Sequence, residues 1–252
     1  MNTPRMLPPR GQIRAGGQCP ICGHETFQDY RERQYEYCVS CRAKARTRLT
    51  YLVLEKLGLL SPGAKVLHFA PEPGLRQRLY EIFGEGYIVA DYDPKKLDGF
   101  NAGGKEIVDL CSPPGHLTNS TFDLLLHSHV LEHLPCNWAL AFMEIHKALK
   151  PNGVHVFSVP MSAEWSRDDV DPGLSDEERT ARFGRPGHYR KFGRQDFRNE
   201  AQKLNHLLGT QMIDAKKFIP KELQYAAHTS GNVFALTPRQ PVGYMPDAVH
   251  IK

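Results

Sequence analysis

Short apolar segments alternate with amphipathic segments between residues 65 and 159, and this alternation restricts the fold more than any other feature. The apolar segments have the length of buried strands, and they are predicted at 65–70, 87–90, 106–108, 122–127 and 154–159. Apolar residues at helical spacing predict helices over 74–84 and 137–149. Strands that alternate with helices form a parallel sheet with both faces covered, so the chain is expected to be a doubly wound α/β protein.

The C-terminal part continues this pattern after an interruption. Residues 161–191 are polar and carry an acidic run followed by several arginines, which predicts an insertion that serves as a lid or substrate loop. A helix near 194–208 and strands near 212–218 and 232–236 follow. They complete a mostly parallel, seven-stranded, Rossmann-like sheet in a domain that we place at 61–240, with a tail over 241–252.

Two cysteine pairs mark a separate small module before this domain. Cys19 and Cys22 form one CxxC pair, Cys38 and Cys41 form the other, and fifteen residues lie between the pairs. This spacing is typical of a tetrahedral four-thiolate zinc site, and four sulfur ligands indicate a structural Zn²⁺ ion. An iron–sulfur cluster or a redox dithiol pair is the alternative.

The module boundaries follow from the flanking composition. We expect a zinc ribbon over 18–42, a flexible Pro/Gly/Arg-rich arm over 1–17 and a linking helix over 43–60. A segment as short as the ribbon cannot bury enough apolar surface to fold without help, and a bound metal supplies that stability.

Charge and hydropathy indicate the surroundings of the protein. Residues 1–50 hold nine Lys/Arg and four Asp/Glu, a net charge of +5, whereas the rest of the chain has a net charge of −1. The basic module therefore contacts a polyanion or is a solvated face. The sequence shows no secretion signal and no apolar run long enough to cross a bilayer, so we expect a cytoplasmic protein without a membrane partner.

Acidic residues follow two predicted strands at the edge where ligands bind in such sheets. Asp91 ends the second strand and Asp109 ends the third. A carboxylate in the first position accepts hydrogen bonds from two ribose hydroxyls, and one in the second accepts from an adenine amine. Either aspartate is alternatively a helix cap or a turn residue.

Two longer motifs resemble a known family. The strings FDLLLHSHVLEHLP and LKPNGVHVFSVP are similar to the fourth and fifth strand motifs of class I S-adenosylmethionine-dependent methyltransferases. More narrowly, KVLHFAPEPGLRQRL, YIVADYDP and RFGRPGHYRKFGRQDF resemble a bacterial subfamily of the methyltransferase type 11 kind, whose members also carry a CxxC…CxxC module and an Arg-bearing helix like CRAKARTRLTYLVL. The resemblance covers most of the chain.

The resemblance implies S-adenosylmethionine as the cofactor and a set of residues that bind it. The first loop would lie against the methionine part, Asp91 on the ribose, Tyr92 on the adenine, and Ser128 with His129 near the sulfonium. The first loop departs from the family pattern, because an acidic residue and glycines are usual where this chain has other residues. The implied cofactor residues are His68, Ala70, Pro71, Glu72, Gly74, Asp91, Tyr92, Asp109, Leu110, Ser128 and His129.

Methyl transfer needs alignment of the acceptor and, for a hydroxyl or ammonium acceptor, a general base. We favour His188, because the resemblance places its segment over the acceptor, and His129, His133 and Tyr189 are the other candidates. The arginines of the insertion, Arg182, Arg185 and Arg190, either grip an anionic acceptor or balance the acidic run before them. The histidine at the end of the fourth strand, His127, and the isolated Cys111 and Cys136 are expected to have no special role.

Three functions are compatible with these features. The first is a methyltransferase for a small-molecule or saccharide acceptor, modified on oxygen or nitrogen. The second is an RNA methyltransferase whose basic ribbon binds phosphates. The third is a non-catalytic protein that binds the cofactor and interacts with a partner. The acceptor and the oligomeric state do not follow from the sequence.

Overall fold

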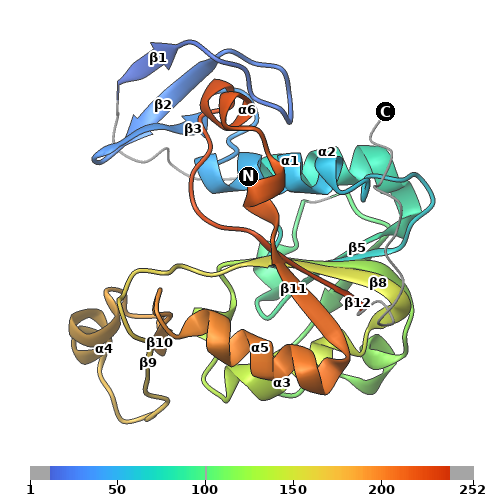
Figure 1. Ribbon diagram of the computed structural model, residues 1–252, viewed down its shortest axis with the longest axis vertical. Helices are drawn as coiled ribbons and strands as arrows, with labels where there is room; N and C mark the ends of the chain where they lie inside the picture. Colours follow the sequence, from blue (N-terminus) through green and yellow to red (C-terminus); the bar gives the residue numbers. More distant parts are fainter. Residues whose placement is uncertain (1–11, 100, 239–252) are drawn as a thin grey trace.

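The main sheet of the protein has seven strands in the order β11-β12-β8-β7-β4-β5-β6 (Figure 1). The computed structural model describes residues 12–99 and 101–238. The strands are β4 (Val66–Phe69), β5 (Tyr87–Asp91), β6 (Gly104–Ile107), β7 (Phe122–Ser128), β8 (Leu149–Ser158), β11 (Thr210–Asp214) and β12 (Phe234–Pro238). Only β12 runs antiparallel to its neighbours. The predicted doubly wound, mostly parallel seven-stranded sheet is confirmed.

The direction in which strands are added reverses beside β4. From β4 the chain adds β5 and β6 on one side, and it then returns to add β7 and β8 on the other side. Loops that leave the carboxyl ends of β4 and β7 therefore diverge to opposite faces of the sheet. This divergence opens a crevice, which is where ligands bind in open α/β sheets.

Helices cover both faces of the sheet. Figure 1 shows α1 (Ala45–Lys56) and α2 (Pro73–Phe83) on one face, and α3 (Trp138–His146) and α5 (Phe197–Leu208) on the other. Side chains alternate between the faces along β7: Leu124 and Leu126 join the core under α1 and α2, and Leu125 joins the core under α3 and α5. No helix of the described part of the chain is both long and apolar enough to cross a membrane.

Several element boundaries differ from the prediction. The strand expected over 212–218 is wrong at its end, because β11 stops at Asp214 and residues Ala215–Phe218 form the 3₁₀ turn η5. The short helix α6 (Lys221–Ala226) then precedes β12. Periodicity alone does not reveal such a turn, since Ala215 in the turn and Ile219 directly after it are buried in the same core as the strands.

The cysteine module is a three-stranded antiparallel sheet. Its strands are β1 (Ile13–Ala15), β2 (Thr26–Tyr30) and β3 (Arg33–Cys38). The prediction of a flexible arm is therefore wrong for residues 13–15, which pair with β2. The rest of the expected arm over 1–11 and the expected tail over 241–252 lie outside the described residues.

The ribbon packs directly on the large domain, and the linking helix α1 belongs to both. Phe27 and Cys38 of the ribbon share one core cluster with Leu49 of α1 and Leu75 of α2. Arg48 of α1 is fully buried, and its guanidinium donates to the carbonyl oxygens of both parts. These acceptors are Tyr35 (2.6 Å), Glu36 (3.2 Å) and Ala43 (2.9 Å) around the ribbon, and Ala227 (2.7 Å) and His228 (2.6 Å) after α6.

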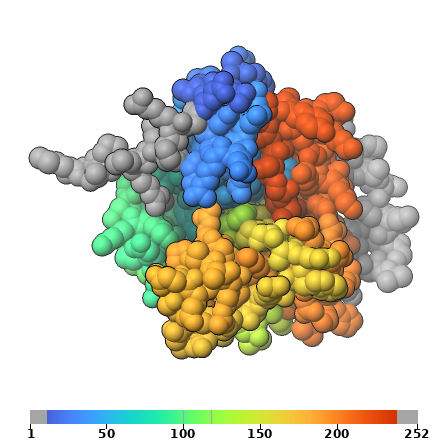
Figure 2. All heavy atoms as spheres, turned by 90° about the vertical axis from the view of Figure 1, so that its left-hand side faces the viewer, coloured from blue at the N-terminus to red at the C-terminus, as the bar shows by residue number. Residues whose placement is uncertain are grey.

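The insertion folds as a small unit of its own. It contains β9 (Arg167–Asp168), α4 (Asp176–Phe183) and β10 (Arg190–Lys191), and β9 pairs with β10. Figure 2 shows this unit in orange beneath the ribbon in blue, on one side of the molecule. Ser175 caps α4 in a reciprocal capping box with Glu178, which explains why the acidic run starts a helix.

Three histidines are fully buried in the sheet and make stability depend on pH. Burial lowers the pKa of His68 and His127 to about 3, and it lowers the pKa of His155 well below 6.5. Unfolding exposes these side chains, so the unfolded chain binds more protons below pH 6.5. We expect the free energy of unfolding to fall on acidification by about 1.4 kcal/mol per pH unit for each histidine.

His127→Phe tests this expectation. Both ring nitrogens of His127 lack a hydrogen-bond partner, and the ring lies 5.5 Å from that of Phe157 and 6.2 Å from that of Phe142. Denaturant unfolding at pH 5 and pH 7 should show a loss on acidification that is about 2 kcal/mol smaller in the variant. The exposed His206→Gln is the control and should leave the loss unchanged. If His127→Phe lost as much unfolding free energy on acidification as the parent protein, the burial of His127 as a neutral ring would be contradicted.

Candidate functional site

A cavity of about 500 Å³ lies at the carboxyl ends of the parallel strands. Its size is in the range of small-molecule and cofactor sites. Residues from the loops after β4, β5, β6 and β7 line it, together with one residue of the insertion. The lining residues are Phe69, Ala70, Ala90, Asp91, Tyr92, Lys96, Val108, Asp109, Leu110, His129, Val130, His133, Leu134, Pro135 and Tyr189.

The two strand-end aspartates line this cavity in matching local conformations. Asp91 Oδ1 accepts a hydrogen bond from the backbone N–H of Asp93 at 3.0 Å, and Asp109 Oδ1 accepts from that of Cys111 at 2.8 Å. Asp91 is 7% exposed, and Lys96 Nζ lies 3.6 Å from its Oδ1. Both aspartates are thus turn residues, and this is compatible with the ligand-site interpretation, because the turn fixes the direction of each carboxylate.

The first loop turns sharply at Ala70, which has a φ of 48° and donates its N–H to Ala90 O at 2.8 Å. This left-handed conformation and the small side chain keep the backbone close to the cavity. Tyr92, a residue that is 74% exposed, lines the cavity, and Leu110 lines it from the loop after β6. An apolar and aromatic wall therefore lies next to the two carboxylates.

The other wall carries titratable side chains. His129 has a φ of 56°, and its Nδ1 lies 3.4 Å from Oε1 of the buried Glu132. Although burial raises the pKa of Glu132, the hydrogen bond from His129 holds it below its usual value. His133 and Tyr189 also line this wall.

Comparison with known proteins identifies the family. A family model described as a methyltransferase domain matches residues 22–206. The chain belongs to this methyltransferase family. The predicted methyltransferase is thereby confirmed, and the match begins inside the cysteine module. No curated protein matches the chain significantly.

Solved structures with a similar fold include three methyltransferases. An S-adenosylmethionine-dependent methyltransferase from Mesorhizobium loti has 17% identity and a TM-score of 0.48, covering 76% of this chain and 98% of that one. A putative S-adenosylmethionine-dependent methyltransferase from Listeria monocytogenes has 15% identity and a TM-score of 0.49, with 76% and 98% coverage. The 1,6-didemethyltoxoflavin-N1-methyltransferase from Burkholderia thailandensis has 18% identity and a TM-score of 0.44, covering 76% of each chain.

Several residues predicted to bind the cofactor of this methyltransferase point away from the cavity. His68 is buried in the sheet, where its Nδ1 lies 2.7 Å from Tyr87 Oη. Glu72 faces α1, where Oε1 accepts from Thr47 Oγ1 at 3.1 Å and lies 3.3 Å from Arg46 Nε. The implied cofactor role of Glu72 thus loses support, since two side chains already hold this carboxylate.

Packing accounts for the remaining predicted positions of the first loop and of β7. At Gly74 a Cβ atom would lie 2.7 Å from Cys41 O and 2.8 Å from Ala43 Cβ, so this glycine lets α2 approach the ribbon. Ser128 is buried and shares a hydrogen bond of 2.8 Å with Ser158. Pro71 is buried as well, and none of the three residues lines the cavity.

His188 is half-buried and is not one of the residues that line the cavity. Its ring meets that of His133 edge-to-face, with 4.6 Å between the centroids. Burial and the neighbouring His133 lower the pKa of His188 to about 4, which makes it a weak base near neutral pH. Tyr189 and His129 are better placed to contact an acceptor, because they line the cavity.

The arginines of the insertion hold structure together. Arg190 is 1% exposed and donates to Leu134 O at 2.8 Å, to Cys136 O at 2.7 Å and to Asp168 Oδ2 at 2.8 Å. Arg182 pairs with Asp169 of the acidic run. Of the two interpretations of these arginines, the structure supports charge balance for Arg182 and Arg190.

Cys111 and Cys136 form a disulfide, so the expectation that they are ordinary small residues is wrong. The bond links the loop after β6 to the loop before α3, and the residues next to the two cysteines, Leu110 and Pro135, both line the cavity. Sequence reasoning missed it because the two cysteines are 25 positions apart in the sequence and neither belongs to a motif. Lys96 was missed for a similar reason, as an exposed lysine carries no sequence signal.

The four sulfur atoms of the ribbon converge at one point. They lie within 4.8 Å of one another, with Cys19 Sγ 3.7 Å from Cys41 Sγ and Cys22 Sγ 3.5 Å from Cys38 Sγ. The sequence prediction that the two CxxC pairs meet is confirmed by this geometry.

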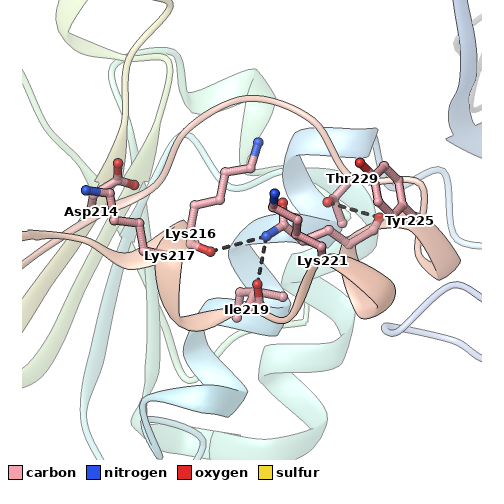
Figure 3. A pocket seen from close by; sticks show the side chains of 8 residues that line it. Asp214, Lys216, Lys217, Ile219, Lys221, Tyr225 and Thr229 are labelled. Carbon is pink, nitrogen blue, oxygen red and sulfur yellow. Dashed lines mark hydrogen bonds between the residues drawn. The ribbon is translucent and has the colours of Figure 1, made fainter.

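A second cavity, of about 530 Å³, lies between β11 and α6 and shares no lining residue with the first. Figure 3 shows Asp214 at one end of the lining and Tyr225 at the other, with Lys216, Lys217 and Lys221 between them. Asp214, the acidic residue of this lining, is paired with Arg198 at 2.6 Å. The cavity is therefore basic, and its α6 wall adjoins the ribbon in Figure 1.

Proposed function

We propose that this methyltransferase binds S-adenosylmethionine in the cavity at the strand ends and methylates an oxygen or nitrogen of a small-molecule or saccharide acceptor. The observation that carries the proposal is the placement of Asp91 and Asp109 in one cavity, each with its carboxylate fixed by a turn. Two hydrogen-bond acceptors at neighbouring strand ends match the ribose hydroxyls and the adenine amine of S-adenosylmethionine.

The lining residues have complementary roles in this proposal. Asp91 accepts hydrogen bonds from the ribose hydroxyls, and Asp109 accepts from the adenine amine beside the Leu110 backbone. Tyr92 packs on the adenine ring, and the tight turn at Ala70 lets the methionine part approach the backbone. The bound cofactor supplies an activated methyl group, so the residues of this chain mainly align the acceptor and exclude water.

The acceptor side is formed by the loop after β7 and the insertion. Tyr189 of the insertion lines the same cavity as Asp91, so the insertion closes a space of small-molecule size over the strand ends. His129 takes the acceptor proton as transfer proceeds, and Glu132, 3.4 Å from its Nδ1, stabilises the imidazolium that results.

RNA remains a second candidate acceptor because of one observation. The lysine-lined cavity beside the ribbon offers positive charge for a phosphate backbone. RNA affinity through these lysines would fall steeply with salt, whereas a small-molecule acceptor would not show this dependence. The absence of RNA binding at low salt would remove this candidate.

We also propose that the four ribbon cysteines bind a structural Zn²⁺ ion. Sulfur atoms at 2.3 Å from a tetrahedral zinc are separated by about 3.8 Å. The observed separations of 3.5 and 3.7 Å fit this geometry. With four thiolates the coordination is complete, so this ion holds the ribbon and leaves no position for a substrate.

Calorimetric titration with S-adenosylhomocysteine tests the cofactor site. We expect micromolar binding to the parent protein and at least tenfold weaker binding to Asp91→Ala, a loss of about 1.4 kcal/mol, because the ribose loses its acceptor. Asp98→Ala is the matched control, since this exposed aspartate lies in the same loop and outside the cavity. Equal affinity of the two variants would refute the ribose role, and binding without turnover on any acceptor would favour the non-catalytic function.

A further inference from the structure

We propose a second metal site, formed by Glu132, His133 and His188, that takes a divalent transition-metal ion at the acceptor wall of the cavity. Each residue offers one ligand atom, and the three atoms lie within 4.8 Å of one another. Glu132 and His133 belong to the 3₁₀ turn η4 (Leu131–His133) after β7, and His188 comes from the insertion. Two imidazoles and one carboxylate are a ligand set that zinc and related ions prefer.

The carboxylate of Glu132 is the first observation that favours a cation here. This residue is 1% exposed, and its Oε2 atom is buried without a hydrogen-bond partner. The other oxygen, Oε1, is the one near His129. A buried carboxylate oxygen left unpaired costs several kcal/mol, and a cation between the three side chains removes that cost.

His133 is already oriented as a metal ligand. Its Nδ1 lies 2.8 Å from the carbonyl oxygen of Gly187, so Nδ1 carries the proton and Nε2 carries the lone pair. A hydrogen bond from one ring nitrogen to a backbone carbonyl is the usual way in which proteins fix a metal-binding histidine. The ring of His188 stands edge-to-face against this imidazole.

The backbone holds the two halves of the site together. Tyr189 N–H donates to Glu132 O at 2.9 Å, next to His188. Arg190 donates to the carbonyl oxygens of Leu131, the first residue of η4, and of Leu134, the residue after it. These contacts keep the insertion fixed on the turn, so the ligands are positioned before an ion arrives.

Three protein ligands leave at least one coordination position open, and His133 and Tyr189 place the ion at the cavity wall. An ion there binds an acceptor oxygen and lowers the pKa of an acceptor hydroxyl, which favours oxygen acceptors such as hydroxy or carboxy compounds. This use in methyl transfer rests on the proposed function, whereas ion binding does not.

Zinc titration of the full-length protein tests the site separately from the cofactor. With the ribbon zinc counted beforehand, calorimetry should show one further Zn²⁺ equivalent with a micromolar or lower dissociation constant. His133→Gln and His188→Gln should each weaken this equivalent at least tenfold. His133 is exposed, so its replacement should leave the melting temperature of the protein without the further ion unchanged.

The control is His116→Gln, which removes an exposed histidine 3.3 Å from Glu106 and should retain the further equivalent. Failure of the parent protein to bind it, or unchanged affinity in His133→Gln, would overturn the site. If S-adenosylhomocysteine still bound in such a case, the cofactor proposal would stand without the metal.

Discussion

Cys38→Ser is expected to lose one zinc per chain relative to the parent protein and to unfold the ribbon. Structural zinc in small modules contributes about 10–16 kcal/mol to folding, more than the net stability of most domains. Cys38 is also fully buried beside Phe27 in the core that the ribbon shares with α1 and α2. Destabilisation should therefore spread to the large domain. Metal analysis and thermal unfolding measure the two effects.

The control for this variant removes cysteines that do not belong to the ribbon. The double variant Cys111→Ser and Cys136→Ser loses the disulfide, should retain the full zinc content, and should be less stable by about 2–4 kcal/mol. If Cys38→Ser kept the zinc content of the parent, the four-thiolate site would be refuted. Zinc loss without a lower melting temperature would show that the ribbon and the domain fold independently.

Arg48→Met is expected to detach the ribbon from the large domain. The substitution keeps a long apolar stem but leaves five carbonyl oxygens without the donor that joins them. Ala43 O still accepts from the Cys38 N–H, whereas each of the other acceptors left unpaired costs about 1–3 kcal/mol, so the total loss is on the order of 4 kcal/mol or more. Denaturant unfolding measures this loss, and hydrogen exchange should show early opening of the ribbon and the segment after α6.

Arg48→Lys separates the effect of charge from that of geometry. A lysine keeps the positive charge, but its single ammonium cannot reach five carbonyls, so most of the loss should remain. Arg33→Met is the control, because Arg33 is an exposed ribbon residue and should change stability by less than about 0.5 kcal/mol. A loss in Arg48→Met no larger than in Arg33→Met would contradict the joining role.

Local sequence patterns determined much of the architecture. Apolar runs of strand length alternating with helical periodicity predict a parallel sheet, because few other arrangements bury both faces of each strand. The CxxC pairs predict the sulfur cluster, since each pair is already a local knuckle. Asp91 and Asp109 were found for the same reason: a residue at the carboxyl end of a parallel strand lies at the ligand edge whatever the details of packing.

Other features depend on contacts between segments far apart in the chain, and only the tertiary structure decided them. Glu72 has the sequence position of a cofactor ligand, but α1 packs close enough for Arg46 and Thr47 to hold it. Gly74 serves the approach of the ribbon. The Cys111–Cys136 bond and the meeting of Glu132 with His188 join separate loops. Such pairings are set by the folded path of the chain, which no local periodicity encodes.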